Sequence, residues 1–296
     1  MKTSTLKYVF ILLISLVSIE VFSENRIPVK EHPSSLNSMV AQLMGWYGRL
    51  LPAERNIFFN QIDKEFKDSL KQYPHDIEHL KIISSQLVNS SKKGLLQFNV
   101  TINIKSKKPA GSIWMTIKEQ FLFNEKKDGS IVLEKIILKG KLTEEERELS
   151  ENTNRMYFKS REFAYSWLAY MDGFGSVKKT INLESWIESS VYNVQIGSKQ
   201  INGSVASSLR QRSVYLHTGQ HTLRSIDITQ DDESQNTYVL DLTMDWKGFN
   251  VKTVPVIAKI NQKIKIKINN DGTWYVLFIE EKHLIPDLTP WQNLLC

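Results

Sequence analysis

A stretch that occurs twice constrains the fold of this chain more than any other feature. Residues 113–130 read IWMTIKEQFLFNEKKDGS, and a shift of 143 positions (256 minus 113) places them without a gap on residues 256–273, VIAKINQKIKIKINNDGT. Each copy alternates apolar and polar residues and then reaches an Asp-Gly pair, which is typical of a long strand that enters a tight hairpin. The chain is therefore predicted to use the same strand and turn once in each half.

One face of this strand is apolar except at a single position in each copy. Side chains of a strand alternate between two faces, and Glu119 interrupts the apolar face of the first copy as Gln262 interrupts that of the second. An unpaired polar group buried there costs about 1–3 kcal/mol. These two side chains are therefore expected either to line a pocket, where Glu119 would be a candidate base, or to be hydrogen-bonded within the core. The apolar members of the two faces are Ile113, Met115, Ile117, Phe121 and Phe123, and Val256, Ala258, Ile260, Ile264 and Ile266.

Both halves are predicted to begin with amphipathic helices. Apolar residues at spacings of three and four indicate a helix over 36–51 that includes Trp46. The same spacing indicates a helix in the second half that contains Trp167 and Tyr170 and ends at Asp172-Gly173. Further helices are predicted over 52–70 and 75–88, because proline suits the first turn of a helix, and over 177–190.

Strands follow the helices in each half. The charged and polar segment 142–154 is predicted to be the domain boundary, either a linker or a short exposed helix. The first domain then spans 24–141 and the second 155–296 with an irregular tail. The fold class is therefore α+β. The predicted strands are 94–105, 112–124, 130–139, 191–196, 212–217, 222–229, 237–246, 255–268 and 273–281.

The first 23 residues have the pattern of a secretory signal. Lys2 and Lys7 precede the apolar run Tyr8–Ile19, and a small residue precedes Glu24. The protein is therefore expected to be exported, either periplasmic or secreted, although an uncleaved membrane anchor is the alternative. The single cysteine, Cys296, is the last residue, so an internal disulfide is excluded and stability must come from packed cores.

Charge gives a weaker signal about partners. The formal net charge is +6, and Lys259, Lys263, Lys265 and Lys267 share one strand face. This face could attract an anionic partner, but a solvated sheet face is the simpler interpretation. No aromatic residues alternate with these lysines, so single-strand nucleic-acid binding is not expected. A membrane contact is expected only through the N-terminal segment if it is retained.

No set of residues converges on a recognisable catalytic or metal site. His75 and His79 lie at a helical i,i+4 spacing, and His217 and His221 have the same spacing, but neither pair has an evident third ligand. The acidic residues Asp241 and Asp245 are expected on a solvated outer face. No catalytic residue, metal or cofactor is assigned.

Helices followed by a curved antiparallel sheet resemble the nuclear transport factor 2-like and SnoaL-like superfamily, whose cystatin-like fold is a cone. The segments that carry the resemblance are FAYSWLAYMDGF at 163–174, LDLTMDWKG at 240–248 and KINQKIKIKINNDGTWYVLFI at 259–279. The second half is more similar than the first. The resemblance implies two tandem cone-shaped domains, each with N-terminal helices packed on a curved sheet that encloses a pocket.

The cone fold makes several residues candidates for pocket lining, although aromatic residues at helical spacing are more often core residues. No position matches a catalytic motif of the superfamily, so the resemblance transfers no role. The pocket-lining candidates are Glu119, Gln262, Trp46, Trp167, Tyr170 and Asp172.

Three functions are open at this stage. The first is an exported, non-catalytic protein that binds a partner protein or a small apolar ligand. The second is a SnoaL-like isomerase, dehydratase or hydrolase acting on a small hydrophobic substrate, which needs titratable groups inside a pocket. The third is a periplasmic component of an envelope or secretion complex, which predicts an uncleaved N-terminus.

Overall fold

The computed structural model describes most of the chain between residues 33 and 284. The N-terminal residues 1–32, which include the predicted signal segment, lie outside it, as do the predicted helix 177–190 and the tail from 285. The described residues are 33–52, 55, 59–60, 62–89, 95–109, 111–127, 130–144, 155–172, 191–196, 199–204, 216–231, 236–250, 255–269 and 274–284.

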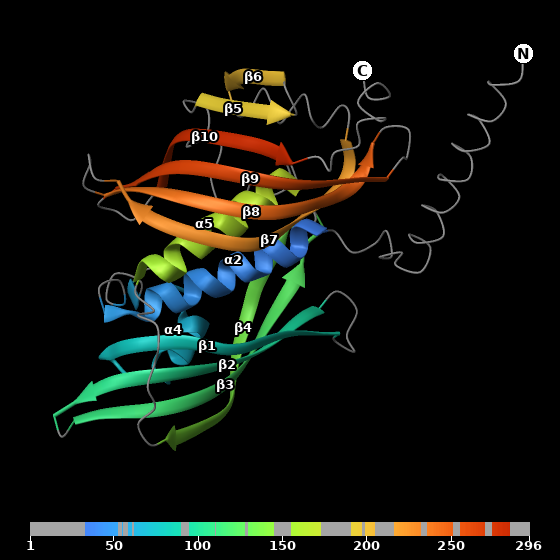
Figure 1. Ribbon diagram of the computed structural model, residues 1–296. Helices are drawn as coiled ribbons and strands as arrows, with labels where there is room; N and C mark the ends of the chain where they lie inside the picture. Colours follow the sequence, from blue (N-terminus) through green and yellow to red (C-terminus); the bar gives the residue numbers. More distant parts are fainter. Residues whose placement is uncertain are drawn as a thin grey trace, which may run out of the picture. The chain divides into compact units, whose positions relative to one another are not determined.

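Two sheets, each preceded by helices, make up the described structure (Figure 1). The first sheet is antiparallel, and the second is antiparallel except for the parallel pair of β5 and β10. The order in the first sheet is β1-β2-β3-β4, and in the second it is β6-β5-β10-β9-β8-β7. The predicted α+β class and the two sheets are confirmed. The elements are α2 (Pro33–Leu50), α4 (Lys64–Leu70), β1 (Ile77–Asn89), β2 (Leu95–Lys108), β3 (Gly111–Glu125), β4 (Ile131–Glu144), α5 (Arg155–Asp172), β5 (Val191–Ile196), β6 (Lys199–Ser204), β7 (Leu216–Gln230), β8 (Thr237–Asn250), β9 (Pro255–Ile268) and β10 (Trp274–Leu284).

The sequence repeat corresponds to a structural repeat. Phe121 on β3 pairs with Phe98 and Ile136, and 143 positions later Ile264 on β9 pairs with Leu240 and Ile279. The strand β4 carries an extra, bulged residue at Glu134, and β10 carries one at Leu277, again 143 positions on (277 minus 134). The two copies therefore share strand order, a bulge and the register from Glu119 to Glu125 and from Gln262 to Ile268, although β4 has a further bulge at Lys139 that β10 lacks.

Another bulge repeats between the first pair of strands in each sheet. Ile83 is the extra residue of β1 against β2, and Arg224 is the extra residue of β7 against β8. Ile83 directly follows the residue that pairs with Ile102, and Arg224 directly follows the residue that pairs with Met244. Ile102 and Met244 occupy equivalent positions in β2 and β8. Bulges increase local twist, so both sheets bend at matching places.

The prediction of a helix over 75–88 is wrong, because residues 77–89 form the strand β1. The prediction rested on Pro74, which suits a helix start, but Ile77 and Leu80 are buried side chains of a strand. A register shift between Ile77 and His79 adds one residue and puts both side chains on the inner face of a strand.

Other predicted boundaries move less. The helix predicted over 52–70 is broken at Asp63, whose extended backbone (φ −64°, ψ 155°) precedes α4. The strand β4 runs to Glu144, into the predicted linker, and residues 145–154 lie outside the described part. The strand predicted over 222–229 and residues 216–217 of the strand predicted over 212–217 belong to one strand, β7, and residues 212–215 lie outside the described part.

The helices α2 and α5 pack against each other and link the two cores (Figure 1). Phe158 of α5 belongs to the first core, where its ring lies 6.3 Å from that of Tyr47. Further along α5, Trp167 and Leu168 belong to the second core. One helix thus supplies buried side chains to both halves. No helix among the described residues is long and apolar enough to cross a bilayer.

The outer edges of the equivalent strands β4 and β10 have different hydrogen-bond partners. The strand β10 is extended by β5, which pairs with it in parallel. On β4, Gln42 of α2 instead bonds the carbonyl of Ile131 (2.8 Å) and the amide of Leu133 (2.9 Å), and Ser69 donates to the carbonyl of Ile136 (3.3 Å). Helix side chains therefore satisfy part of the β4 edge that a strand would otherwise cover.

Candidate functional site: buried carboxylates in both cores

Glu119 is buried in the first core and held by two tyrosines. Its side chain is only 2% exposed. The Tyr47 hydroxyl of α2 donates to Oε2 at 2.5 Å, and the Tyr73 hydroxyl donates to Oε1. Trp46 in turn donates from Nε1 to the Tyr73 oxygen at 3.2 Å. Both oxygens of the carboxylate are therefore bound by protein donors.

Burial decides the protonation of this cluster. Desolvation raises the pKa of Glu119 to about 7, although the two tyrosine hydrogen bonds oppose the rise. Burial and the nearby Glu119 charge raise the pKa of Tyr47 and of Tyr73 well above the ordinary value. Both phenols therefore stay protonated and remain donors when Glu119 titrates.

Arg55 fixes the position of Tyr73. Its guanidinium donates to the carbonyls of Leu70 and Tyr73, both at 3.0 Å, and to that of Pro74. These carbonyls belong to the last residue of α4 and to the turn after it, where helical hydrogen bonding leaves acceptors without partners. Burial lowers the pKa of Arg55. Arg55 thus holds the turn from which Tyr73 reaches Glu119.

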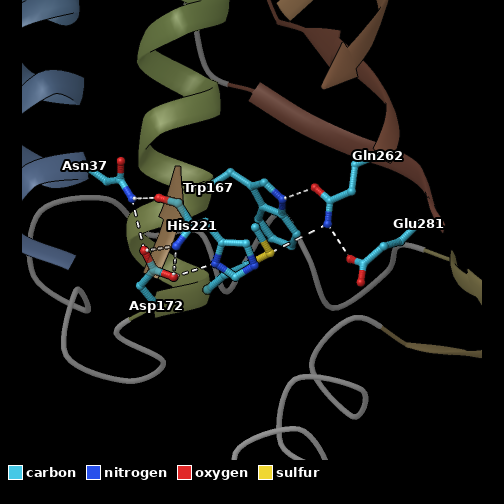
Figure 2. A network of polar contacts seen from close by, with 7 residues as sticks. Asn37, Trp167, Asp172, His221, Gln262 and Glu281 are labelled. Atoms are coloured by element: carbon cyan, nitrogen blue, oxygen red, sulfur yellow. Dashed lines mark hydrogen bonds and ion pairs between the residues drawn. The ribbon is translucent and has the colours of Figure 1, made fainter. Parts of the chain in front are cut away.

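Gln262 occupies the position of Glu119 in the second core and joins a second network (Figure 2). Trp167 donates from Nε1 to its Oε1 at 2.8 Å, and its own Nε2 donates to Glu281 Oε2 at 2.5 Å. The carboxylate of Glu281, which is fully buried, also accepts a hydrogen bond from Tyr192 at 2.5 Å and contacts His283 through Oε1.

Asp172 ends α5 and ties it to two other elements (Figure 2). It accepts hydrogen bonds from the His221 amide (3.0 and 3.1 Å), from His221 Nδ1 (2.5 Å) and from Asn37 Nδ2 (3.0 Å). Asn37 also donates to the carbonyl of His221 (3.1 Å). A carboxylate at a helix C-terminus opposes the helix dipole, so these donors compensate for an unfavourable position.

The two networks of the second half meet in the last turn of α5. Met171 precedes Asp172, and its sulfur accepts from Gln262 Nε2 at 3.7 Å. Figure 2 shows Asp172 and His221 on one side of this turn and Gln262 and Glu281 on the other. The end of α5 therefore connects the Asp172–His221 pair to the Glu281 cluster.

The six sequence-predicted residues divide between the two cores. Glu119 and Trp46 lie in the first, and Trp46 reaches Glu119 through Tyr73. The other four, Gln262, Trp167, Tyr170 and Asp172, lie around the second, where the rings of Trp167 and Tyr170 stack with centroids 6.0 Å apart. That these residues line a pocket stays a prediction.

The other candidate groups have simpler places. Because 77–89 is a strand, His75 and His79 lack the helical geometry expected of them, and His217 and His221 both lie on β7. In the described part of the chain, no cluster of three or more histidine, cysteine or acidic residues could hold a metal.

The outer face of the second sheet is charged. Lys263 lies 3.8 Å from Asp241, across the β8–β9 pair, and both side chains are largely exposed. Arg224 donates to Asp245 through Nε (2.8 Å) and a terminal nitrogen (2.6 Å). These pairings fit the expected solvated outer face.

Sequence reasoning missed the donors and one acid. Tyr73, Tyr192, Asn37 and Glu281 were not candidates for the site, and His221 was considered only as a metal ligand with His217. Glu281 shares an inner face with Trp274 and Val276, but the bulge at Leu277 breaks the alternation that would have revealed it. No pattern in the sequence pointed to Asn37, whose partners lie on elements far along the chain.

Comparisons with known proteins give only distant structural similarities. The sequence matches no family model and no curated protein. An uncharacterised protein with a cystatin-like fold from Caulobacter vibrioides is similar to 46% of this chain over 95% of its own length, with 8% identity and a TM-score of 0.33. A ketosteroid isomerase-like protein from Erwinia carotovora atroseptica is similar to 42% of this chain over 92% of its own length, with 11% identity and a TM-score of 0.32.

A third solved structure is a hexachlorocyclohexane dehydrochlorinase, LinA-type3, from Novosphingobium barchaimii. It is similar to 40% of this chain over 79% of its own (11% identity, TM-score 0.31). Likenesses at this level carry no information about the ligand or reaction of this chain. The chain itself has an α+β architecture in which helices precede each of two separate sheets.

Proposed function

We propose that this protein is an exported, non-catalytic binding protein. The observation that carries the proposal is the state of the three buried carboxylates, Glu119, Asp172 and Glu281. All six of their oxygens accept hydrogen bonds from, or lie in ion pairs with, donors of the protein itself. These groups hold elements together, and a ligand would have to displace a donor to reach any of them.

The energetic cost of such displacement disfavours catalysis. A general acid or base exchanges a proton with a substrate within hydrogen-bond reach. Breaking one buried hydrogen bond of Glu119 would leave a polar group unsatisfied at a cost of about 1–3 kcal/mol. The proposed ligand is a partner protein or a small apolar molecule. The proposal of export rests on the sequence pattern of residues 1–23.

Native mass spectrometry of the protein, purified from the exported fraction without denaturation, tests this proposal. The expected result is a co-purifying protein or small apolar molecule, retained to the same extent by wild type and by the His221→Gln variant. If neither a protein nor a small apolar molecule co-purifies with the protein, the proposal is overturned. N-terminal sequencing of the same sample tests cleavage before Glu24.

A second candidate function is an acid–base enzyme of the isomerase, dehydratase or hydrolase type. The Asp172–His221 pair favours it, because a carboxylate bound at Nδ1 leaves Nε2 of the imidazole as the basic nitrogen. The ring tautomer follows from this hydrogen bond.

Untargeted mass spectrometry of a metabolite extract, incubated with wild type or with His221→Gln, separates the two candidates. The binding proposal expects the same metabolite profile in both samples. A compound that wild type consumes and that the folded His221→Gln variant leaves intact would establish the enzyme instead.

A further inference from the structure

Three exposed apolar side chains meet at one end of the outer face of the second sheet. In the register of β8, β9 and β10, Ile257 pairs with Lys247, Phe249 pairs with Pro255, and Leu284 pairs with Lys259. Phe249 and Leu284 are thus diagonal neighbours of Ile257 on either side, within reach of large side chains. We call Phe249, Ile257, Leu284, Lys247 and Lys259 the Ile257 patch.

The apolar members of the patch are unusually exposed for their type. Ile257 is 53% exposed, Leu284 46% and Phe249 41%. Other exposed large apolar residues of the described chain, such as Ile83 on β1, do not form a three-strand group of this kind. Clustered apolar exposure on a folded surface commonly marks an interaction site.

The cationic members of the patch are not neutralised by the acid beside them. Lys247 and Lys259 are exposed, and the carboxylate opposite Lys259 across the sheet is Asp245. Asp245 is already engaged by two nitrogens of Arg224, at 2.8 and 2.6 Å. The net charge of the whole chain is +6. This end of the sheet presents exposed apolar side chains next to two lysines, neither of which pairs with an acid among the described residues.

We infer that the Ile257 patch docks the protein on the surface of an anionic lipid bilayer. The apolar tips would enter the boundary between headgroups and acyl chains, and the two lysines would lie near lipid phosphates. A free phosphate would engage the lysines but leave the apolar side chains in water. A bilayer matches both features at once, and this inference is independent of what the cone domains bind.

Vesicle co-sedimentation of the full chain tests the inference. The full chain should bind phosphatidylcholine vesicles that contain phosphatidylglycerol, and the Lys247→Glu/Lys259→Glu and Phe249→Ser/Ile257→Ser variants should each bind about tenfold more weakly. The matched controls are Lys267→Glu, at the other end of β9, and Ile83→Ser on β1, which should bind like wild type. Equal binding by patch and control variants would overturn the inference.

A site-specific probe excludes binding by the N-terminal segment alone. In a Cys296→Ser background, an environment-sensitive fluorophore on Ile257→Cys should shift to the blue on anionic vesicles, and the same label on Ile83→Cys should not. An unshifted label at 257 would overturn the proposal. Patch-dependent binding of poly-glutamate without vesicle binding would do so as well, because it would identify an acidic protein as the partner.

Discussion

Glu119 and Glu281 belong to equivalent cross-strand pairs, one in each sheet, but they lie on opposite members of those pairs. Glu119 on β3 pairs with Leu138 on β4, and 143 positions later Gln262 on β9 pairs with Glu281 on β10. Tyrosine hydroxyls bind the carboxylate in both halves. Each core therefore keeps one buried acid at this pair, although the strand that supplies it differs.

Replacing Glu119 with Gln should remove a pH dependence of stability. Burial raises the pKa of Glu119 from 4.5 to about 7, so the folded state binds this proton more tightly than the unfolded state. The free energy of unfolding should therefore be greatest at low pH and fall as pH rises between these two values, by at most about 3 kcal/mol.

Urea unfolding of wild type and Glu119→Gln on both sides of this pH window measures the effect. Gln262 stands at the equivalent position of the second sheet, so glutamine should fit the site. If the two proteins lose the same stability between low and high pH, Glu119 does not have the raised pKa.

Tyr47→Phe should destabilise the protein more at high pH than at low pH. The Tyr47 hydroxyl bonds the carboxylate and lowers the pKa of Glu119, so its loss costs most when Glu119 is charged, about 1–3 kcal/mol. A double-mutant cycle with Glu119→Gln measures the coupling. Tyr165→Phe is the control, since the Tyr165 hydroxyl bonds none of the described residues; an equal loss in both variants would refute the role of Tyr47.

Asn37→Ala should loosen the contact of α2 with β7 and α5. The amide of Asn37 donates to Asp172 and to the carbonyl of His221, and leaving buried acceptors without a donor costs about 1–3 kcal/mol. Denaturant unfolding and hydrogen exchange of the His221 amide should both report the loss. Gln97→Ala, which removes an exposed hydrogen bond to Asn99, should leave both unchanged. Unaltered exchange at His221 in Asn37→Ala would contradict the prediction.

Gly219→Ala should displace the indole of Trp246. A Cβ at position 219 would lie 2.3 Å from Nε1 of Trp246 and 2.4 Å from two of its ring carbons, and such overpacking costs about 1–3 kcal/mol. Gly140→Ala is a matched control in a strand, because its Cβ would meet nothing within 4 Å. Thermal unfolding compares the two. A Gly219→Ala protein as stable as Gly140→Ala would show that the indole can move freely.

The repeat was predictable because it is encoded in local alternation. Burial alternates along β9 from Ile257 to Lys267 and along β3 from Ile117 to Glu125, although Trp114 and Thr116 on the other face of β3 are also buried. No bulge interrupts β9 against β8 or β3 against β2. Where the alternation is regular, burial follows directly from sequence parity.

Bulges explain what could not be predicted. An extra residue near Glu78 interrupts the alternation of β1, and the bulge at Leu277 hid Glu281. A bulge depends on the partner strand, so the sequence of one strand alone does not reveal it. The donors of the site come from distant elements, such as Tyr47 and Tyr73 for Glu119, and their meeting depends on tertiary packing.

The central claim is that the two halves contain copies of one four-stranded sheet with the same strand order and pairing. Backbone NMR contacts between cross-strand neighbours test this claim most directly. Short-range NOEs should connect Glu119 with Leu138 and Gln262 with Glu281, and also Val100 with Glu119 and Leu242 with Gln262. Observation of all four contacts at these positions would support the claim. A register in either sheet that differs from this shared pairing by even one residue would contradict it, because it would turn one of the two polar side chains away from its core.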